Sequence, residues 1–267
     1  MKVENSTVST TGDSSPAIMI ADGGGILIAD GGSFTTSGAM SQGIYSKGDV
    51  TVTNASVNAL NAKAAVLKGN NTITLSGTTL EGKETTDTVP YNIVLFSDEK
   101  DIGTMGTQHF DVRGGSLISH KGGMFYVTAT HGKISLNGTA ITMDDPAANL
   151  ITVAGNGGAN GWGTPGRNGG HVELVADNQV LTGNISVDSI SNINMTLKNN
   201  STFNGMISIV PNAEGGEKYK TNADVFIAAG STWNLTGNST LTSLYNLGTI
   251  NYNGYTITLA DGTVMKA

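Results

Sequence analysis

The sequence contains no cysteine, little charge and few aromatic residues. Asp, Glu, Lys and Arg together make up 13% of its 267 residues, and Phe, Trp and Tyr make up 6%. The absence of cysteine excludes disulfide bonds, thiolate metal sites and cysteine nucleophiles. No apolar run approaches the roughly 18–20 residues that a membrane-spanning helix requires. The sequence therefore predicts neither a disulfide-stapled scaffold nor a helical membrane span.

The few charges are mostly negative, with a net charge of -7. Phosphate binding needs a clustered basic face, and no cluster of Lys or Arg occurs, so we expect no nucleic-acid partner. The start of the chain does not have the pattern of a signal peptide either. Residues Met1–Val8 instead resemble a repeat that is already under way. We therefore expect this chain to be a fragment of a longer repetitive protein.

Glycine, threonine, serine and asparagine occur in nearly every segment, and one phrase recurs among them. Its clearest copy is Val50–Val57 (VTVTNASV). Alternating apolar and polar residues are followed there by three small residues, which are expected to form a corner, and then by another apolar residue. Alternation with period two is typical of a β-strand rather than a helix. Other copies begin at Ile26, Ile73, Phe110 and Ile134, and looser ones begin at Val172, Met195 and Val225.

The first apolar residue of each copy, with Met1 as the start, measures the length of the repeat. Successive copies are 25, 24, 23, 37, 24, 38, 23 and 30 residues apart. Repeats of about 20 to 50 residues indicate stacked units, each of which buries its apolar face against its neighbours. Most units also hold a second apolar run, at residues 17–20, 43–45, 64–67, 93–96, 124–127 and 150–153.

Two or three short strands in each unit describe one coil of a parallel β-helix. We therefore predict an all-β fold, a single-stranded right-handed parallel β-helix (solenoid) of about nine to ten coils with side loops. It forms one domain over residues 1–267, with regular coils and insertions in 1–180 and coils of a different character in 181–267. The strand expected within Gly254–Leu259 would cap the solenoid, because an open end leaves backbone groups unpaired.

Three coils carry more residues than the repeat needs, and the excess must leave the solenoid as loops. The loops are expected within Glu81–Gly106, Gly155–Gly170 and Pro211–Thr221. Insertions on one face of a solenoid are where its binding surfaces usually form. We therefore expect the function to depend on these three loops.

The C-terminal coils contain Ser231–Asn251 (STWNLTGNSTLTSLYNLGTIN), which resembles the last coils of pertactin-like autotransporter passenger domains and related bacterial surface adhesins. The resemblance is strongest over Ser201–Leu259. The earlier coils are similar, more generally, to pectin-lyase-like right-handed β-helices of secreted bacterial proteins. The resemblance implies a β-helix at the bacterial surface or outside the cell, and it implies little about the ligand.

Polysaccharide lyases and hydrolases of this fold group carboxylates on one face. The best pair in this sequence is Asp144–Asp145, but adjacent strand residues point to opposite sides, and Pro146 indicates a turn that these residues could cap. The run Asp98–Asp101 offers carboxylates without the glycine and spacing of a calcium loop. We therefore predict no catalytic residue, no metal and no cofactor.

The histidines and threonines suggest metal binding and ice binding as less favoured functions. His109, His120, His131 and His171 form no closely spaced pair in the sequence, although coil stacking would bring His109 and His131 together. The threonine pairs Thr51/Thr53 and Thr72/Thr74 resemble an ice-binding face, but they do not continue on later coils. Threonine is also simply a good strand former, so ice binding is the least favoured function.

Trp162, Arg167 and Tyr91 are the candidate ligand-binding residues. Trp162 lies in a glycine-rich loop, where an exposed indole could stack on a sugar ring while Arg167 binds a carboxylate or hydroxyl. Tyr91 lies in the first insertion. The alternative is that Trp162 folds back against the side of the helix. Trp233, by contrast, follows a corner and is expected to pack in the core.

We predict that the chain is a non-enzymatic segment of a bacterial adhesin, at the cell surface or secreted. It would bind a glycan or a host surface protein through its side loops and one long face, and we expect a monomer. The alternative is a polysaccharide lyase or glycoside hydrolase on the same fold. Clustering of acidic residues on one face would favour the enzyme.

Overall fold

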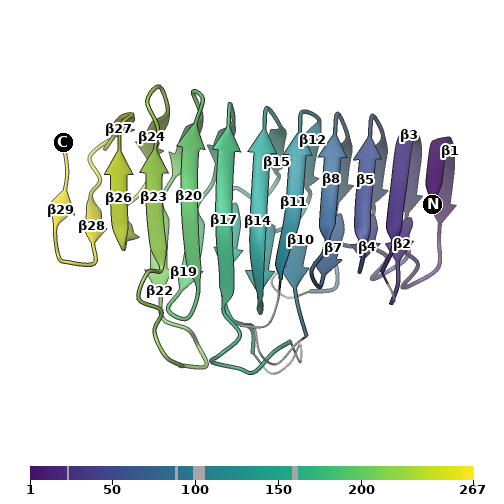
Figure 1. Ribbon diagram of the computed structural model, residues 1–267, viewed down its shortest axis with the longest axis horizontal. Helices are drawn as coiled ribbons and strands as arrows, with labels where there is room; N and C mark the ends of the chain where they lie inside the picture. Colours follow the sequence, from purple (N-terminus) through teal and green to yellow (C-terminus); the bar gives the residue numbers. More distant parts are fainter. Residues whose placement is uncertain (23, 88–89, 99–105, 158–161) are drawn as a thin grey trace.

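The computed structural model describes residues 1–22, 24–87, 90–98, 106–157 and 162–267. Within these residues it contains 29 strands and no helix (Figure 1). Nearly all neighbouring strands pair in parallel, and most strands pair with the equivalent strand one coil later. The predicted all-β parallel solenoid is confirmed. In the same residues, no helical segment has the length and apolarity needed to cross a bilayer.

Each coil passes over three faces in turn. The strands of the first face are β1 (Lys2–Thr10), β3 (Ile26–Thr36), β5 (Asp49–Thr53), β8 (Thr72–Ser76), β11 (Thr107–Arg113), β14 (Thr130–Asn137), β17 (Gly170–Asp177), β20 (Asn192–Lys198), β23 (Ala223–Ile227) and β26 (Ser243–Asn246). These ten strands mark ten coils in the described residues, and each coil is named below by its first-face strand.

The second and third faces complete the coils. The second-face strands are β6 (Ser56–Ala59), β9 (Thr79–Gly82), β12 (Ser116–Ser119), β15 (Ala140–Met143), β18 (Val180–Thr182), β21 (Thr202–Gly205), β24 (Thr232–Leu235) and β27 (Thr249–Asn251). The third-face strands are β2 (Ile18–Ile20), β4 (Ile44–Ser46), β7 (Ala65–Lys68), β10 (Tyr91–Phe96), β13 (Gly123–Thr128), β16 (Ile151–Val153), β19 (Ile185–Asp188), β22 (Ile207–Val210), β25 (Ser239–Leu241) and β28 (Ile257–Leu259). The long strands β1 and β3 each bend across both the first and second faces.

The corner between the first and second faces explains the small polar centre of the repeat phrase. In most coils one or two residues at this corner have a positive φ, which only glycine and, less readily, asparagine adopt at little cost. In Val50–Val57 that residue is Asn54, with a φ of 51°. The equivalent residues of other coils are Asn5, Gly31, Gly77, Gly114, Gly138 and Asn178. The recurrence of Asn and Gly is therefore a requirement of the bend.

The core is one continuous column of apolar side chains inside the coils. It includes the second apolar run of each coil, which the sequence predicted and which forms the third face. Aromatic residues fill it at a few points, such as Phe110, which meets Phe125 edge-on at 5.7 Å. Trp233 is fully buried, which confirms its predicted packing role.

The register between neighbouring coils corrects two of the residues that were used as the start of a repeat copy. Val50 aligns with Leu27 rather than Ile26, whose side chain points outward and is 63% exposed. Ile134 aligns with Leu174 rather than Val172, so that coil spans 40 residues instead of 38. A further coil begins at β26, where Leu244 aligns with Val225. The expected capping strand within Gly254–Leu259 is β28. A further strand, β29 (Val264–Met265), follows it and pairs with it in the antiparallel direction.

Most of the excess residues of the long coils lie at one corner, between the third and first faces. Three connections leave there, at residues 97–106, 154–169 and 211–222, although 99–105 and 158–161 lie outside the described residues. Figure 1 shows the later two projecting from the lower edge of the sheet. The rest of the first insertion, of which residues 83–87 and 90 are described, connects β9 to β10 at the corner between the second and third faces. We call the corner with the three connections the loop corner.

Candidate ligand-binding site

A second apolar cluster lies outside the solenoid, on the outer side of the third face. Alternate residues of β7, β10 and β13 point into the core, so that Val66, Val94 and Tyr126 point outward. The outward residues form a cluster of their own rather than a polar surface. We call this the outer cluster, and its members are Tyr45, Val66, Tyr91, Val94, Phe96, Tyr126 and Trp162.

Tyr91 reaches across the outer cluster from one coil to the second coil beyond. Its ring stacks on Tyr126 with a centroid distance of 5.0 Å, and its hydroxyl donates to Oγ1 of Thr152 at 2.9 Å. Gly123 makes room for the ring, because a Cβ at that position would lie 2.7 Å from it. Burial raises the pKa of Tyr91 and raises that of Tyr126 to about 12, so both phenols are neutral hydrogen-bonding groups.

Trp162 is half-buried and belongs to the same cluster. Its indole stacks on Phe96 at a centroid distance of 4.0 Å, and its backbone carbonyl accepts hydrogen bonds from the side chains of Asn156 and Asn168, both at 2.8 Å. The two buried asparagines therefore fix the loop that carries the indole. The structure thus brings Trp162 and Tyr91 to one cluster. Arg167 lies in the same loop with an exposed side chain, outside that cluster.

The second and third connections pack on one another. Gly166 approaches Gly216 so closely that a Cβ at Gly216 would lie 2.0 Å from the Gly166 carbonyl oxygen. One carboxylate oxygen of Asp188 accepts both the backbone N–H of Gly155, at 2.8 Å, and the side-chain amide of Asn212. The predicted loops at these positions therefore form one joined surface beside the outer cluster.

A polar hollow adjoins the outer cluster at the loop corner. It has a volume of about 750 Å³, within the range of small-ligand sites of roughly 300–1,000 Å³. Its ionic residues are Lys47, which pairs with Asp22, and Lys68, which pairs with Asp98 at 2.5 Å. The ammonium of Lys68 also lies 5.8 Å from the centre of the Phe96 ring. The remaining lining residues are Gly69, Asn70, Asn71, Ser97, Gly106 and Thr130.

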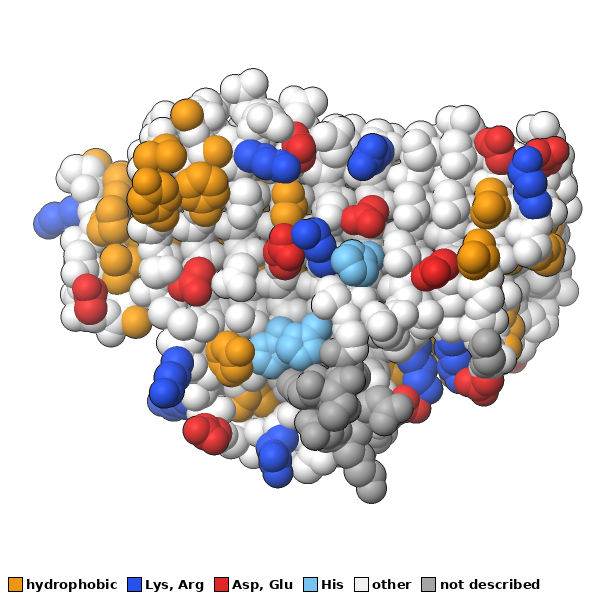
Figure 2. All heavy atoms as spheres, in the orientation of Figure 1, with side chains coloured by type: hydrophobic (Ala, Val, Ile, Leu, Met, Phe, Trp, Pro, Cys, Tyr) orange, Lys and Arg blue, Asp and Glu red, His pale blue; other side chains and the backbone are white. Residues whose placement is uncertain are grey.

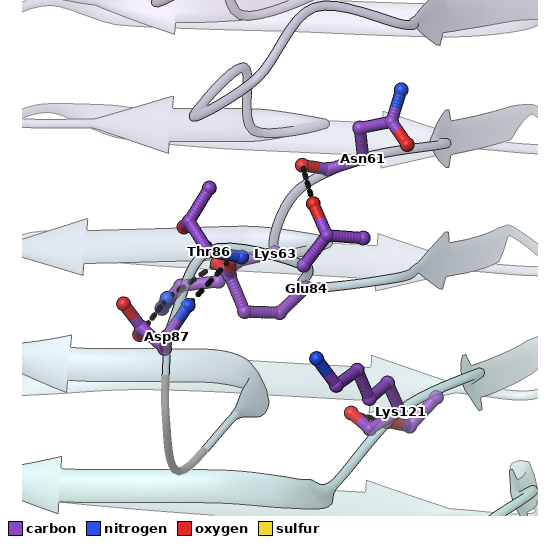
Figure 3. A network of polar contacts seen from close by, with 8 residues as sticks. Asn61, Lys63, Glu84, Thr86, Asp87 and Lys121 are labelled. Atoms are coloured by element: carbon purple, nitrogen blue, oxygen red, sulfur yellow. Dashed lines mark hydrogen bonds and ion pairs between the residues drawn. The ribbon is translucent and has the colours of Figure 1, made fainter.

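An ion-pair network holds the chain that leads into Tyr91. The ammonium of Lys63 lies between the carboxylates of Glu84, at 2.6 Å, and Asp87, at 2.5 Å (Figure 3). Thr86 donates to Glu84 from its backbone N–H at 2.6 Å and from its hydroxyl at 2.5 Å. Burial acts most strongly on Glu84 and raises its pKa, but the hydrogen bonds from Lys63 and Thr86 together lower it to about 2. Glu84 is therefore a buried structural carboxylate.

Two carboxylates do meet at the corner between the second and third faces. His120 lies between them, with Nε2 2.5 Å from Glu81 and Nδ1 2.7 Å from Asp144. The three residues come from three successive coils. The hydrogen bonds of His120 raise its pKa, and the one to Asp144 contributes most, followed by the one to Glu81. Asp145 instead accepts the backbone N–H of Ala147 at 3.0 Å, which confirms the predicted turn-capping role for this residue.

The raised pKa of His120 predicts a pH-dependent stability. Stabilisation by the protonated imidazole is fully present below the unfolded-state pKa of about 6.5 and is lost as pH rises through the higher folded-state pKa. The melting temperature of His120→Gln should therefore fall below that of the unmutated chain at pH 6, and the gap should narrow by pH 9. A gap that does not depend on pH would contradict the ionic role of His120.

The positions of the histidines, acidic residues and threonines test the suggestions of metal binding and ice binding. His131 stacks on His171 at 4.8 Å, and His109 lies on the coil before His131, where it aligns with Lys133 two residues further along the strand. Of the Asp98–Asp101 run, only Asp98 is described. No group of three or more His, Asp or Glu side chains in the described ranges is arranged to hold a metal ion. On the first face, Thr51 and Thr74 align, and Asp111 interrupts their ladder on the next coil.

Sequence reasoning did not identify Tyr126, Phe96 or the hollow lysines. A signal was present, because the runs Ala64–Leu67, Ile93–Phe96 and Met124–Val127 are apolar without interruption. A strand with one face in water alternates, whereas a continuous run indicates that both sides are covered. These three runs are the strands that carry the outer cluster.

No protein-family model, curated protein or solved structure matches the chain. Its candidate site therefore rests on its own geometry, in which an aromatic cluster outside the core adjoins a polar hollow at the loop corner.

Proposed function

We propose that this chain is a non-enzymatic segment of a bacterial surface or secreted adhesin, and that it binds a glycan at the loop corner. The observation that carries the proposal is the outer cluster beside the polar hollow. The solenoid already has a continuous core, so folding does not require aromatic side chains on the outer side of the third face. A sugar needs both an apolar surface for its ring and polar groups for its hydroxyls.

The two halves of the corner supply these two requirements. Half-buried Tyr45, Tyr126 and Trp162 offer ring surface, while Asn70 and Asn71 in the hollow offer amides. Lys68 joins the halves, since it lines the hollow and also lies against Phe96. Exposed Arg167 extends the corner with a donor for a carboxylate or hydroxyl. A host surface protein is the other partner that such a corner could bind.

The placement outside the cell rests on the resemblance of the later coils to pertactin-like passenger domains. The all-strand solenoid supports that resemblance at the level of architecture. Extended solenoids present long surfaces whose insertions can vary without disturbing the core. An adhesin segment would use the loop corner in this way.

Replacement of Trp162 by alanine tests the site directly. We expect glycan hits from an array to bind the Trp162→Ala variant about tenfold more weakly, because a stacking surface is lost. Calorimetry on the strongest hit gives the dissociation constant. Thr164→Ala is the matched control, since Thr164 is exposed in the same loop.

Three outcomes are decisive for this proposal. Weaker binding by Trp162→Ala together with unchanged binding by Thr164→Ala supports the site. Unchanged binding by Trp162→Ala would remove the loop corner as the glycan site. An array without hits, combined with capture of a defined host surface protein that depends on Trp162, would replace the glycan by a protein partner.

A polysaccharide-degrading enzyme is the second candidate, because Glu81 and Asp144 meet at His120. The feature that would favour an enzyme is thus present on one corner of the solenoid. Both carboxylates are hydrogen-bonded to the same imidazole, which fits a structural cluster equally well. Incubation with polysaccharides distinguishes the two functions. Release of reducing or unsaturated sugar by the unmutated chain, abolished in His120→Ala, would overturn the adhesin proposal.

A further inference from the structure

A groove on the first face has one aromatic wall and one polar wall. It crosses β20, β23 and β26 and has a volume of about 440 Å³. Met195, Val225 and Leu244 align across these strands and form its floor with their backbone. The flanking side chains, one residue before and one after each floor residue, point outward as two parallel ladders. The walls are therefore set by the coil register.

The aromatic wall consists of Phe226 and Tyr245, and Thr196 continues it on β20. Their rings stack with a centroid distance of 5.6 Å and an angle of 24° between the planes. Tyr245 is 63% exposed, so its ring is available to a ligand. Figure 2 shows hydrophobic side chains gathered over the β23 and β26 end of this face, whereas the middle of the face carries charged and polar side chains. The pair is not needed by the core, which lies on the other side of the sheet.

The polar wall consists of Asn194, Asp224 and Ser243. These residues align in register on the three strands, opposite the aromatic wall. Ser243 donates its hydroxyl to one carboxylate oxygen of Asp224 at 2.6 Å. A carboxylate accepts several hydrogen bonds, so Asp224 can also accept from a ligand, and the Asn194 amide can both donate and accept.

We propose that this groove is a binding site for an uncharged hexose oligosaccharide. The two walls lie about 7 Å apart along the strands, as two residues of an extended strand require, and the three coils span about 10 Å. An extended sugar chain has the matching form, with apolar ring faces and a polar edge of hydroxyl groups. The site is separate from the loop corner and does not depend on ligand binding there.

The carboxylate selects against acidic sugars. Asp224 lies in the polar wall, and the chain as a whole has a net charge of -7. A uronic acid would bring a second carboxylate against Asp224, and like charges at short range repel. Hydroxyl groups of an uncharged hexose instead donate to it. The groove is therefore expected to prefer neutral glycans.

The test uses calorimetry with tetrasaccharides of glucose, mannose and galactose, and with tetragalacturonate as the anionic probe. At least one neutral probe should bind the full chain, and tetragalacturonate should bind at least about tenfold more weakly than that probe. Tyr245→Ala should weaken the neutral probe about tenfold. Tyr245→Phe, which keeps the ring, should bind within about twofold of the unmutated chain. Asp224→Asn should narrow the preference for the neutral probe over tetragalacturonate.

Controls separate this groove from the loop corner and from failure to fold. Trp162→Ala should leave binding in the groove unchanged, whereas Tyr245→Ala should leave binding at the loop corner unchanged. Melting temperature and circular dichroism of Tyr245→Ala should match the unmutated chain, because the side chain is exposed.

Several results would overturn the groove as a sugar site. They are no binding of any neutral probe, equal binding by Tyr245→Ala, or loss of all sugar binding in Trp162→Ala alone. Light scattering could give a further contrary result. If the unmutated chain is a dimer and Tyr245→Ala is a monomer, a second copy of the chain occupies the groove.

Discussion

Trp233→Ala should lower the free energy of unfolding by about 3–5 kcal/mol, the usual cost of deleting a large buried aromatic side chain. Trp233 is fully buried, packs against Phe203 with a ring-centroid distance of 5.6 Å and donates from Nε1 to the Gly205 carbonyl at 2.9 Å. The variant would lose the packing and leave that carbonyl without its donor. For a chain of this size, we expect the melting temperature to fall by about 6–20 °C.

Thermal unfolding followed by circular dichroism measures this effect. Trp233→Phe is the informative control, because it keeps an aromatic ring but removes the indole N–H. Its loss should be smaller than that of the alanine variant. A decrease below about 1 kcal/mol for Trp233→Ala would show that the later coils contribute little to global stability.

Lys63→Met should destabilise the chain by about 3–5 kcal/mol at pH 7, because it leaves buried Glu84 without its cation. The side chains of Lys63 and Glu84 are 11% and 3% exposed. Glu84→Gln should cost less, since it removes the buried charge and keeps an acceptor for Thr86.

Acidification should reduce the difference in free energy of unfolding between Lys63→Met and the unmutated chain. The pKa of Glu84 is lowered to about 2, so its stabilising contribution is present above the unfolded-state value of about 4.3 and is lost as pH falls towards 2. Without Lys63, the folded-state pKa of Glu84 lies closer to its unfolded-state value. Acidification therefore removes less free energy of unfolding from Lys63→Met than from the unmutated chain. Urea unfolding at pH 7, 4 and 2.5 measures the trend. A difference that widens on acidification would contradict it.

The repeat phrase predicted the architecture because its period measures the circumference of a coil. It could not specify the inward residue where apolar residues are consecutive. Ile26, Leu27 and Ile28 are equally apolar in the sequence, and only the neighbouring coil, with Val50 beside Leu27, selects the residue that points inward. A one-residue change of register exchanges the two sides of a strand.

The candidate site was predictable only as a set of insertions. Counting excess residues indicated where chain must leave the coils, and Trp162 and Tyr91 could be named within those segments. Their partners could not be named. Tyr126 meets Tyr91 because the parallel register brings successive coils together on the third face, and Phe96 meets Trp162 because the later connection lies against that face. The groove of Phe226 and Tyr245 has the same origin, since the two rings align in register.

The contacts of Tyr91 and Trp162 also bear on how the solenoid would yield to a pulling force. In a simple stack each coil holds only its immediate neighbours, so coils can detach one at a time from an end. Tyr91 instead bonds to Thr152 two coils further on, and Phe96 holds Trp162 from the connection that follows that later coil. The β8, β11 and β14 coils are therefore fastened together, and stepwise unzipping should pause there before the block gives way as a unit.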